Sequence, residues 1–71
     1  MGERIKQIRG FFKLDQREFA KRLGVSWQTI SAMERETKKI NADLIVRIEE
    51  VFNADSGWIL NGRGNPFLPN F

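Results

Sequence analysis

Two short segments that can pack across each other restrict the fold of this sequence more than any other feature. Apolar and small side chains recur at helical spacing through residues 16–35, at Phe19, Ala20, Leu23, Val25, Ile30 and Met33. Gly24 stands between the segments, where a left-handed backbone can end one helix and turn the chain. The pattern predicts two helices joined by a tight turn, with Ala20 at their closest approach and a polar face left on the second helix.

Three further helices are predicted around this pair, and no strand is indicated. The expected helices are Gly2–Phe12, the stretch after Asp15 to Leu23, Trp27–Arg35, Ala42–Phe52, and a short one from Asp55 or Ser56 to Asn61. We therefore predict an all-α fold, a compact bundle of five helices.

Capping residues support several of these boundaries. Asp15 is followed three residues later by Glu18, which is a variant of the capping box. Ser26 and Asn41 stand before the third and fourth helices, where a side-chain oxygen can accept from the first backbone N–H groups. These residues place the starts of the second, third and fourth predicted helices.

A chain of 71 residues makes one small domain. We expect the domain to occupy residues 1–62, and residues 63–71 to be a C-terminal tail or the start of a linker. Three apolar side chains in that tail leave alternatives open: Phe67, Leu68 and Phe71 either fold back on the body or belong to an interface or a following domain.

Charge is distributed unevenly along the chain. The net charge is +3, with +5 on residues 1–40 and −2 on residues 41–71. The helix pair therefore lies in the basic part, as binding to nucleic-acid phosphates would require. The alternative is an ordinary solvated surface.

The composition argues against an enzyme. The chain has no cysteine and no histidine, which excludes disulfides and thiolate sites and removes the commonest catalytic base and metal ligand. The adjacent pair Glu49-Glu50 cannot converge on one helix face. We expect no catalytic residues, cofactor, metal or evident small-molecule ligand. Short apolar runs and a charged N-terminus predict a cytoplasmic protein that does not enter a membrane.

The outer face of the third predicted helix is the candidate binding surface. Gln28, Ala32 and Arg35 point away from the buried side of this helix, with Ser31 on the flank. An exposed polar helix held rigidly at a surface suits the major groove of DNA. The Gln28 amide donates and accepts at once, which suits adenine N6 and N7, and Ala32 suits a thymine methyl.

Neighbouring residues are assigned to the same surface. Two roles are open for Trp27, whose ring either lies on sugar and methyl groups or packs back against the preceding helix. Lys38 and Lys39 either hold the DNA backbone or belong to a solvated loop. The candidate DNA-binding residues are Gln16, Ser26, Trp27, Gln28, Thr29, Ser31, Ala32, Arg35, Lys38 and Lys39.

These residues give the chain a family resemblance. The stretch Gln16–Arg35, and more loosely Gly2–Gly62, resembles the lambda-repressor/Cro-type (XRE-like) helix-turn-helix DNA-binding family. The matching elements are Gly2–Arg9, Leu14–Ala20, Leu23–Ser26, Ile30, Glu34, Ile45, Ile48, Phe52, Trp58–Leu60 and Gly62. The resemblance implies a five-helix bundle that binds operator DNA, usually as a two-fold dimer.

By position, the resemblance also implies roles for single residues. Gln16 corresponds to a residue that clamps a phosphate and braces the first base-contacting side chain, while Trp27, Gln28 and Ala32 fall where the family reads bases. Arg9 and Glu34 match an ion pair between the first and third helices.

The chain departs from the family pattern at several positions. Lys13 and Glu36 stand where glycine is usual, Asn41 where proline often opens the fourth helix, and Glu49 where alanine is frequent. Glu36 also adds negative charge near the expected DNA. Trp27 is uncommon at a base-facing position, so the operator sequence cannot be transferred from relatives.

The sequence thus predicts a sequence-specific regulator of transcription that binds double-stranded DNA, a phage- or prophage-type repressor or the N-terminal domain of one. A homodimer is expected, with Leu44, Val51, Ile59 and Leu60 as interface candidates; alternatively these are core or singly exposed residues. The competing function is an antitoxin or other protein-binding module, with the apolar tail Phe67–Phe71 as its binding element.

Overall fold

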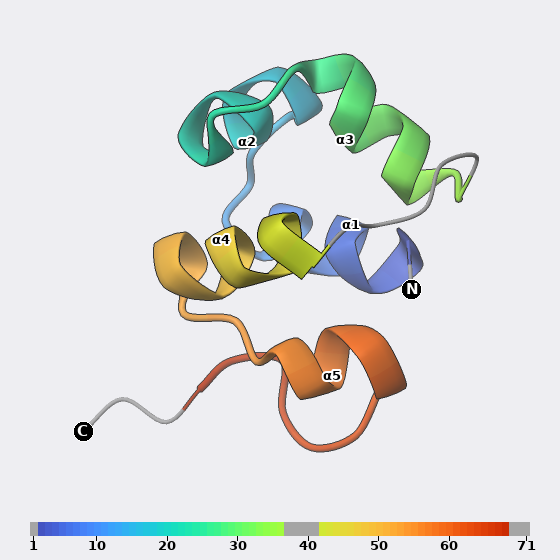
Figure 1. Cartoon of the computed structure of the whole chain (residues 1–71), viewed down its shortest axis with the longest axis vertical. Helices are drawn as coiled ribbons and strands as arrows, with labels where there is room; N and C mark the ends of the chain where they lie inside the picture. Colours follow the sequence, from blue (N-terminus) through green and yellow to red (C-terminus); the bar gives the residue numbers. More distant parts are fainter. Residues whose placement is uncertain (1, 37–41, 69–71) are drawn as a thin grey trace.

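Five helices follow one another in the part of the chain that the structure describes, residues 2–36 and 42–68 of a computed structural model (Figure 1). The helices are α1 (Gly2–Phe11), α2 (Gln16–Leu23), α3 (Trp27–Glu34), α4 (Ala42–Phe52) and α5 (Ser56–Asn61). The predicted all-α bundle is confirmed. The predictions for Lys38, Lys39, Asn41 and Phe71 fall outside the described residues.

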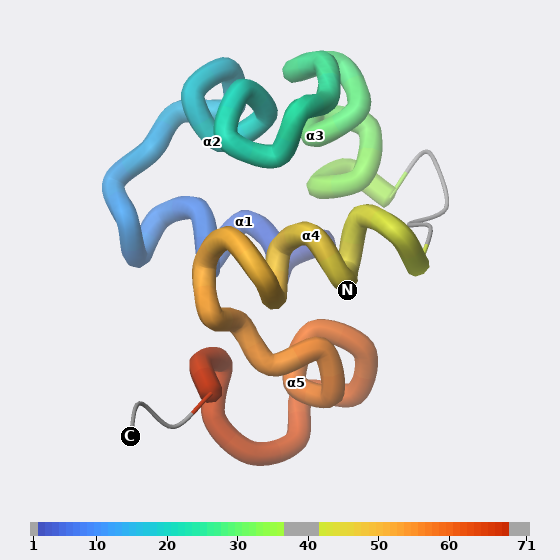
Figure 2. The backbone as a smooth tube through the Cα atoms, turned by 60° about the vertical axis from the view of Figure 1, so that its left-hand side comes forward, coloured from blue at the N-terminus to red at the C-terminus, as the bar shows by residue number. Residues whose placement is uncertain are grey.

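The helices form three levels. Figures 1 and 2 show α2 and α3 at one end, α1 and α4 across the middle, and α5 at the other end. Helix α2 packs against α3 and α4, α1 packs against α3 and α5, and α4 packs against α5. The α2–α3 pair therefore rests on the middle level and turns its outer side to solvent.

Short-range hydrogen bonds set the ends of α2 and α3. The Asp15 side chain accepts from the Glu18 N–H at 2.8 Å, and Ser26 Oγ accepts from the Thr29 N–H at 3.3 Å. Gly24 closes α2 with φ 73° and donates to Lys21 O at 3.2 Å. These contacts confirm the predicted caps and explain why the turn is tight.

Apolar side chains from every helix fill the interior. The buried apolar residues are Ile5, Ile8, Phe19, Ala20, Leu23, Ile30, Met33, Leu44, Ile45, Ile48, Phe52, Ala54 and Ile59. Two interface candidates are among them, since Leu44 is 3% exposed and Ile59 is fully buried. Both are therefore core residues, the alternative that the sequence left open, because α4 is covered by α2 and α5, and α5 packs on α1 and α4.

The other two interface candidates are exposed. Val51 is 48% and Leu60 45% exposed, so both present apolar surface to solvent. Single exposed apolar residues are common in monomers. Both side chains are accessible to a second copy of the chain, and the dimer remains a prediction.

The segment after α5 folds back on the body. Phe67 forms an isolated antiparallel bridge with Ala54, flanked by hydrogen bonds from Asp55 N to Pro66 O and from Leu68 N to Asn53 O, both 2.8 Å. Of the alternatives for this segment, the fold-back is therefore the one found for residues 66–68.

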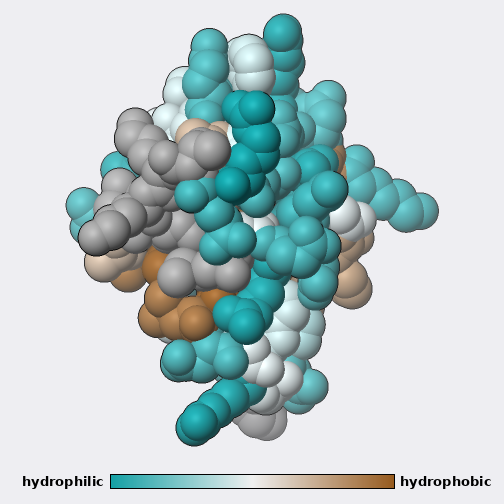
Figure 3. All heavy atoms as spheres, turned by 90° about the vertical axis from the view of Figure 1, so that its right-hand side faces the viewer, coloured by the Kyte–Doolittle hydropathy of each residue, from teal (hydrophilic) through white to brown (hydrophobic). Residues whose placement is uncertain are grey.

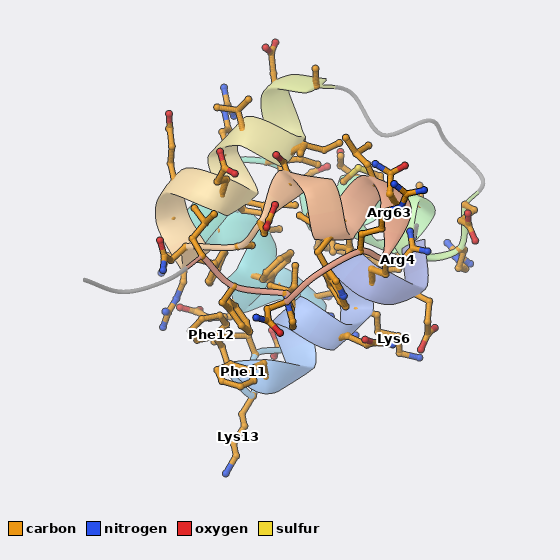
Figure 4. All side chains as sticks on the ribbon, turned by 90° about the horizontal axis from the view of Figure 1, so that it is seen from below. Arg4, Lys6, Phe11, Phe12, Lys13 and Arg63 are labelled. Carbon is orange, nitrogen blue, oxygen red and sulfur yellow. The ribbon has the colours of Figure 1, made fainter. Side chains whose placement is uncertain are left out.

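Phenylalanine rings connect this segment to the interior. Phe67 lies 4.6 Å from Phe11 and 5.7 Å from Phe12, measured between ring centroids. Phe12 lies 5.0 Å from Phe52, which stacks on Phe19 at 4.8 Å. We call these five residues the aromatic chain. It runs from the exposed ring of Phe11 at one end of α1 (Figure 4) into the core.

The opposite end of α1 makes polar and close backbone contacts. Arg4 donates from Nη1 to Ile59 O at 3.1 Å, and Figure 4 shows it at the end of α1 away from Phe11. Gly2 is buried against the end of α3, where an added Cβ would lie 2.5 Å from Met33 O and 2.6 Å from Glu34 O. Only glycine allows this approach of α1 to α3.

Among residues 2–36 and 42–68, three residues other than glycine have a left-handed backbone. Lys13, Glu36 and Asn53 have φ values of 56°, 57° and 58°. Each lies between helices or just after one. Lys13 and Glu36 stand at two of the positions where the family resemblance leads one to expect glycine, and the backbone there has the conformation that glycine would favour.

Candidate nucleic-acid interface

Helix α3 has one buried and one exposed side. Ile30 is fully buried and Met33 is 2% exposed, whereas Gln28 and Arg35 are exposed and Ala32 is half-buried. The side of the molecule drawn in Figure 3 is mainly hydrophilic over its upper part, formed by α2 and α3. The structure thus places Gln28, Ala32 and Arg35 on the predicted outward face.

Ser31 lies elsewhere. Its side chain is buried, with 8% of the residue exposed, on the flank between the core side and the outer side of α3. The sequence placed Ser31 on the flank of the outward face, but α3 is covered by α1 as well as by α2, so its buried arc extends past Ile30 and includes Ser31. A small side chain is compatible with that close packing.

Two hydroxyls stand at the start of α3. Ser26 Oγ and Thr29 Oγ1 lie 2.9 Å apart, and either can be the donor. Ser26 is exposed and Thr29 is half-buried. Since a hydroxyl has one donor and two acceptor sites, this pair retains capacity for a further hydrogen bond.

Trp27, in the first turn of α3, is paired with a cation. Its side chain is 39% exposed, and the Arg17 guanidinium carbon lies over the ring, 5.4 Å from the centroid. The ring therefore contacts α2, as in one of the two roles predicted for it, but at the surface and through a charged side chain. The sequence did not indicate Arg17 as part of this surface, because no local pattern links it to Trp27, ten positions further along the chain.

A hydrogen-bonded network joins α1, α2 and α3 below this pair. Arg9 Nε donates to Glu34 Oε2 at 2.7 Å and Arg9 Nη2 donates to Glu34 Oε1 at 3.1 Å, which confirms the ion pair expected from the resemblance. Gln16 Nε2 donates to the same Glu34 Oε1 at 3.1 Å, and Arg9 Nη1 donates to Leu14 O at 2.9 Å. The network orients Gln16 at the start of α2.

Arg9 stays protonated, and therefore positively charged, over the accessible pH range. The hydrogen bond to Glu34 raises the pKa of Arg9, against an opposing effect of burial. Because the pKa is higher in the folded state than in the unfolded state, the charge of Arg9 contributes its full stabilisation of the fold at every pH below the ordinary arginine pKa. Its contribution is lost only as the pH rises above that range.

A surface hollow lies where α2 and α3 begin. Its volume is about 370 Å³, and it is lined by Arg9, Asp15, Gln16, Arg17 and Trp27. The hollow is thus built from three cationic or amide side chains, one carboxylate that caps α2, and one indole. The arrangement offers N–H donors to an anion.

Residues 2–36 and 42–68 contain no cluster of three or more histidine, cysteine, aspartate or glutamate side chains that could hold a metal. Within the same ranges, none of the helices is long and apolar enough to cross a membrane.

The chain is similar to known helix-turn-helix proteins. The model of a family described as a helix-turn-helix domain matches residues 2–65. An Archaeoglobus fulgidus protein named "Uncharacterized HTH-type transcriptional regulator" is 41% identical over 54 residues, which are 76% of this chain and 76% of that protein. No solved structure matches the chain. With the outward α3, the Arg9–Glu34 pair and the Gly24 turn, these matches show that the chain belongs to the lambda-repressor/Cro-type (XRE-like) helix-turn-helix family.

Proposed function

We propose that this chain regulates transcription by binding double-stranded DNA, with α3 reading base edges in the major groove. The observation that carries the proposal is the outward face of α3, on which Gln28 and Arg35 are exposed while Ile30 and Met33 anchor the helix in the core. A rigid helix with this division suits a groove wide enough to admit it.

Single residues have distinct tasks in this proposal. Gln28 pairs with an adenine through its amide, and Ala32 contacts a thymine methyl. Ser26 and Thr29 donate to a phosphate or a base from the start of the helix. Arg35 contacts the DNA backbone beyond the last turn of α3, and Lys38 and Lys39, which follow it in the sequence, contact it as well.

Gln16 is suited to hold a phosphate. One of its two amide N–H groups is engaged by Glu34 at 3.1 Å, which fixes the side chain at the start of α2. The second N–H then donates to a phosphate oxygen. A restrained donor loses less conformational entropy when the DNA binds.

We further propose a cytoplasmic homodimer on a pseudo-palindromic operator, as in a phage- or prophage-type repressor or the N-terminal domain of one. A single recognition helix contacts too few base pairs to select one site in a genome. Two copies related by a two-fold axis read half-sites about one helical turn apart. Val51 and Leu60 are the exposed candidates for the contact between copies.

The antitoxin alternative depends on the apolar tail being available to a partner. In this structure Phe67 contacts Phe11 and Phe12, and residues 66–68 pair with residues 53–55. Phe67 and Leu68, the part of the proposed binding element that the structure describes, are therefore engaged within the chain, and the DNA-binding function is preferred.

Selection of bound duplexes from a random pool tests the proposal. We expect a two-fold symmetric sequence to outcompete bulk DNA, and the absence of any preferred sequence at two salt concentrations would overturn the proposal. Gln28→Ala is expected to relax the preference at one position in each half-site, at a cost of about 1–3 kcal/mol on the selected duplex. Gln7→Ala removes the same amide from the exposed side of α1 and is expected to leave the preference unchanged.

A further inference from the structure

We infer that Trp27 positions Arg17 for contact with the DNA backbone and does not itself read a base. This inference rests on the proposed function and assigns a task to Arg17, which the family resemblance leaves without one. It also gives the uncommon tryptophan at the first position of α3 a physical reason.

The contacts of Arg17 distinguish it from the other arginines nearby. Arg9 is held by Glu34, and Arg22 forms an i,i+4 ion pair with Glu18 at 3.7 Å. In the described part of the chain no carboxylate forms an ion pair with Arg17, whose recorded contact is the ring of Trp27. The charge of Arg17 is therefore exposed and available to an outside anion.

The ring contact suits a backbone clamp. A guanidinium carries five N–H donors, and an aromatic face that attracts it does not occupy all of them, so donors remain for phosphate oxygens. Holding the side chain there removes part of its rotamer freedom before the DNA arrives. The indole has one donor and no acceptor, so it is a poor reader of base edges.

The surroundings of the pair favour the same ligand. Arg17 and Trp27 line the 370 Å³ hollow together with Gln16, whose second amide N–H is directed to a phosphate in the proposed function. Asp15 is the carboxylate in the lining, and its oxygen accepts from the Glu18 N–H at 2.8 Å, where it caps α2. A phosphate at this hollow would meet N–H donors of Gln16 and Arg17 from α2, and Gln28 directly follows Trp27 in α3.

The test is the salt dependence of DNA binding, measured on the selected duplex and on a random duplex. Arg17→Ala is expected to weaken binding to both duplexes by a similar factor and to reduce the slope of log K against log salt by about one. Arg22→Ala removes a charge from the same helix, but one already paired, and is expected to change the slope less.

Trp27 is tested in the same assay with Trp27→Ala and Trp27→Phe. If Trp27 acts through Arg17, Trp27→Ala weakens both duplexes alike, leaves the selected sequence unchanged, and adds little to Arg17→Ala in the double variant. Trp27→Phe keeps a ring face and is expected to recover part of the loss. Thermal unfolding of each variant shows whether the fold is retained.

Different outcomes overturn different statements. A change in the preferred base when Trp27 is replaced, additive losses in the double variant, or an unchanged salt slope for Arg17→Ala would overturn the inference. A wild-type protein that selects no sequence would overturn the proposed function instead, and the random-duplex measurements would still judge the Arg17 contact.

Discussion

The two ends of this molecule are held in different ways. At the α2–α3 end, Gly24 and two side-chain caps fix the helix ends, and a carboxylate shared by Arg9 and Gln16 ties α3 to its neighbours. Toward the α5 end, where residues 66–68 return to the body, the rings of the aromatic chain dominate, with a short backbone pairing beside them.

The difference matches what each end has to do. Hydrogen bonds are directional, so they hold a helix at a defined angle and register. Ring packing buries more apolar area but tolerates small rotations. We therefore expect losses in the aromatic chain to lower stability without changing base preference, and losses at the α2–α3 end to change DNA binding beyond their effect on stability.

The largest expected effect tests the aromatic chain. Phe52 is 4% exposed and lies between the rings of Phe12 and Phe19. Phe52→Ala is expected to lower the free energy of unfolding by about 3–5 kcal/mol, from lost burial and the remaining cavity, measured by urea denaturation. Val46→Ala, in the same helix and half-exposed, is expected to cost less than about 1 kcal/mol. An altered DNA preference in the folded Phe52→Ala fraction would contradict the comparison.

A somewhat smaller effect tests the polar network. The Glu34 side chain is 4% exposed, and Glu34→Ala leaves the Arg9 guanidinium without its carboxylate. We expect a loss of about 3 kcal/mol, at the low end for a broken buried pair, because Arg9 keeps its bond to Leu14 O and is 17% exposed. Unfolding of the variant and its affinity for the selected duplex are both measured.

A double variant in the same network separates its effect on the position of Gln16 from its effect on the stability of the fold. Arg9→Met with Glu34→Leu removes both charges and is expected to recover much of the lost stability. It cannot restore the restraint on Gln16, so DNA affinity should remain low. Full recovery of affinity would show that the network serves stability alone.

The smallest of these effects tests the contact of α1 with the end of α3. A Cβ on Gly2 would lie within 2.6 Å of two carbonyl oxygens of α3, so Gly2→Ala is expected to cost about 1–3 kcal/mol. Gly10 is in the same helix, and a Cβ there would meet nothing within 4 Å. Gly10→Ala is therefore expected to stabilise the protein by about 0.5–1 kcal/mol. Equal shifts of the melting temperature for the two variants would refute the close approach.

Local signals made much of the fold predictable from sequence. The start and end of α2 follow from Asp15 and Gly24, whose effects are confined to one turn, and the bounds of α4 were predicted as found. Burial was less predictable, because it depends on the neighbours of a helix as well as on its own periodicity. Ser31 and Leu44 are interior for that reason.

Contacts between distant parts of the chain were out of reach. The pairing of residues 66–68 with residues 53–55 has no signature in either segment, so the sequence left several roles open for the tail. Arg17 and Trp27 likewise meet only because α2 and α3 pack together. The Arg9–Glu34 pair was predicted, but through family resemblance and not from spacing.

The left-handed joints at Lys13 and Glu36 affect how this sequence can evolve. A side chain in that conformation costs on the order of 1 kcal/mol relative to glycine, and both joints lie outside α3. Lys13 is exposed, and glycine there would thus compensate for damage elsewhere while leaving Gln28 in place. Genetic suppressors of weakened variants should accumulate at this codon, which makes it a natural starting point for a mutationally robust form of the domain.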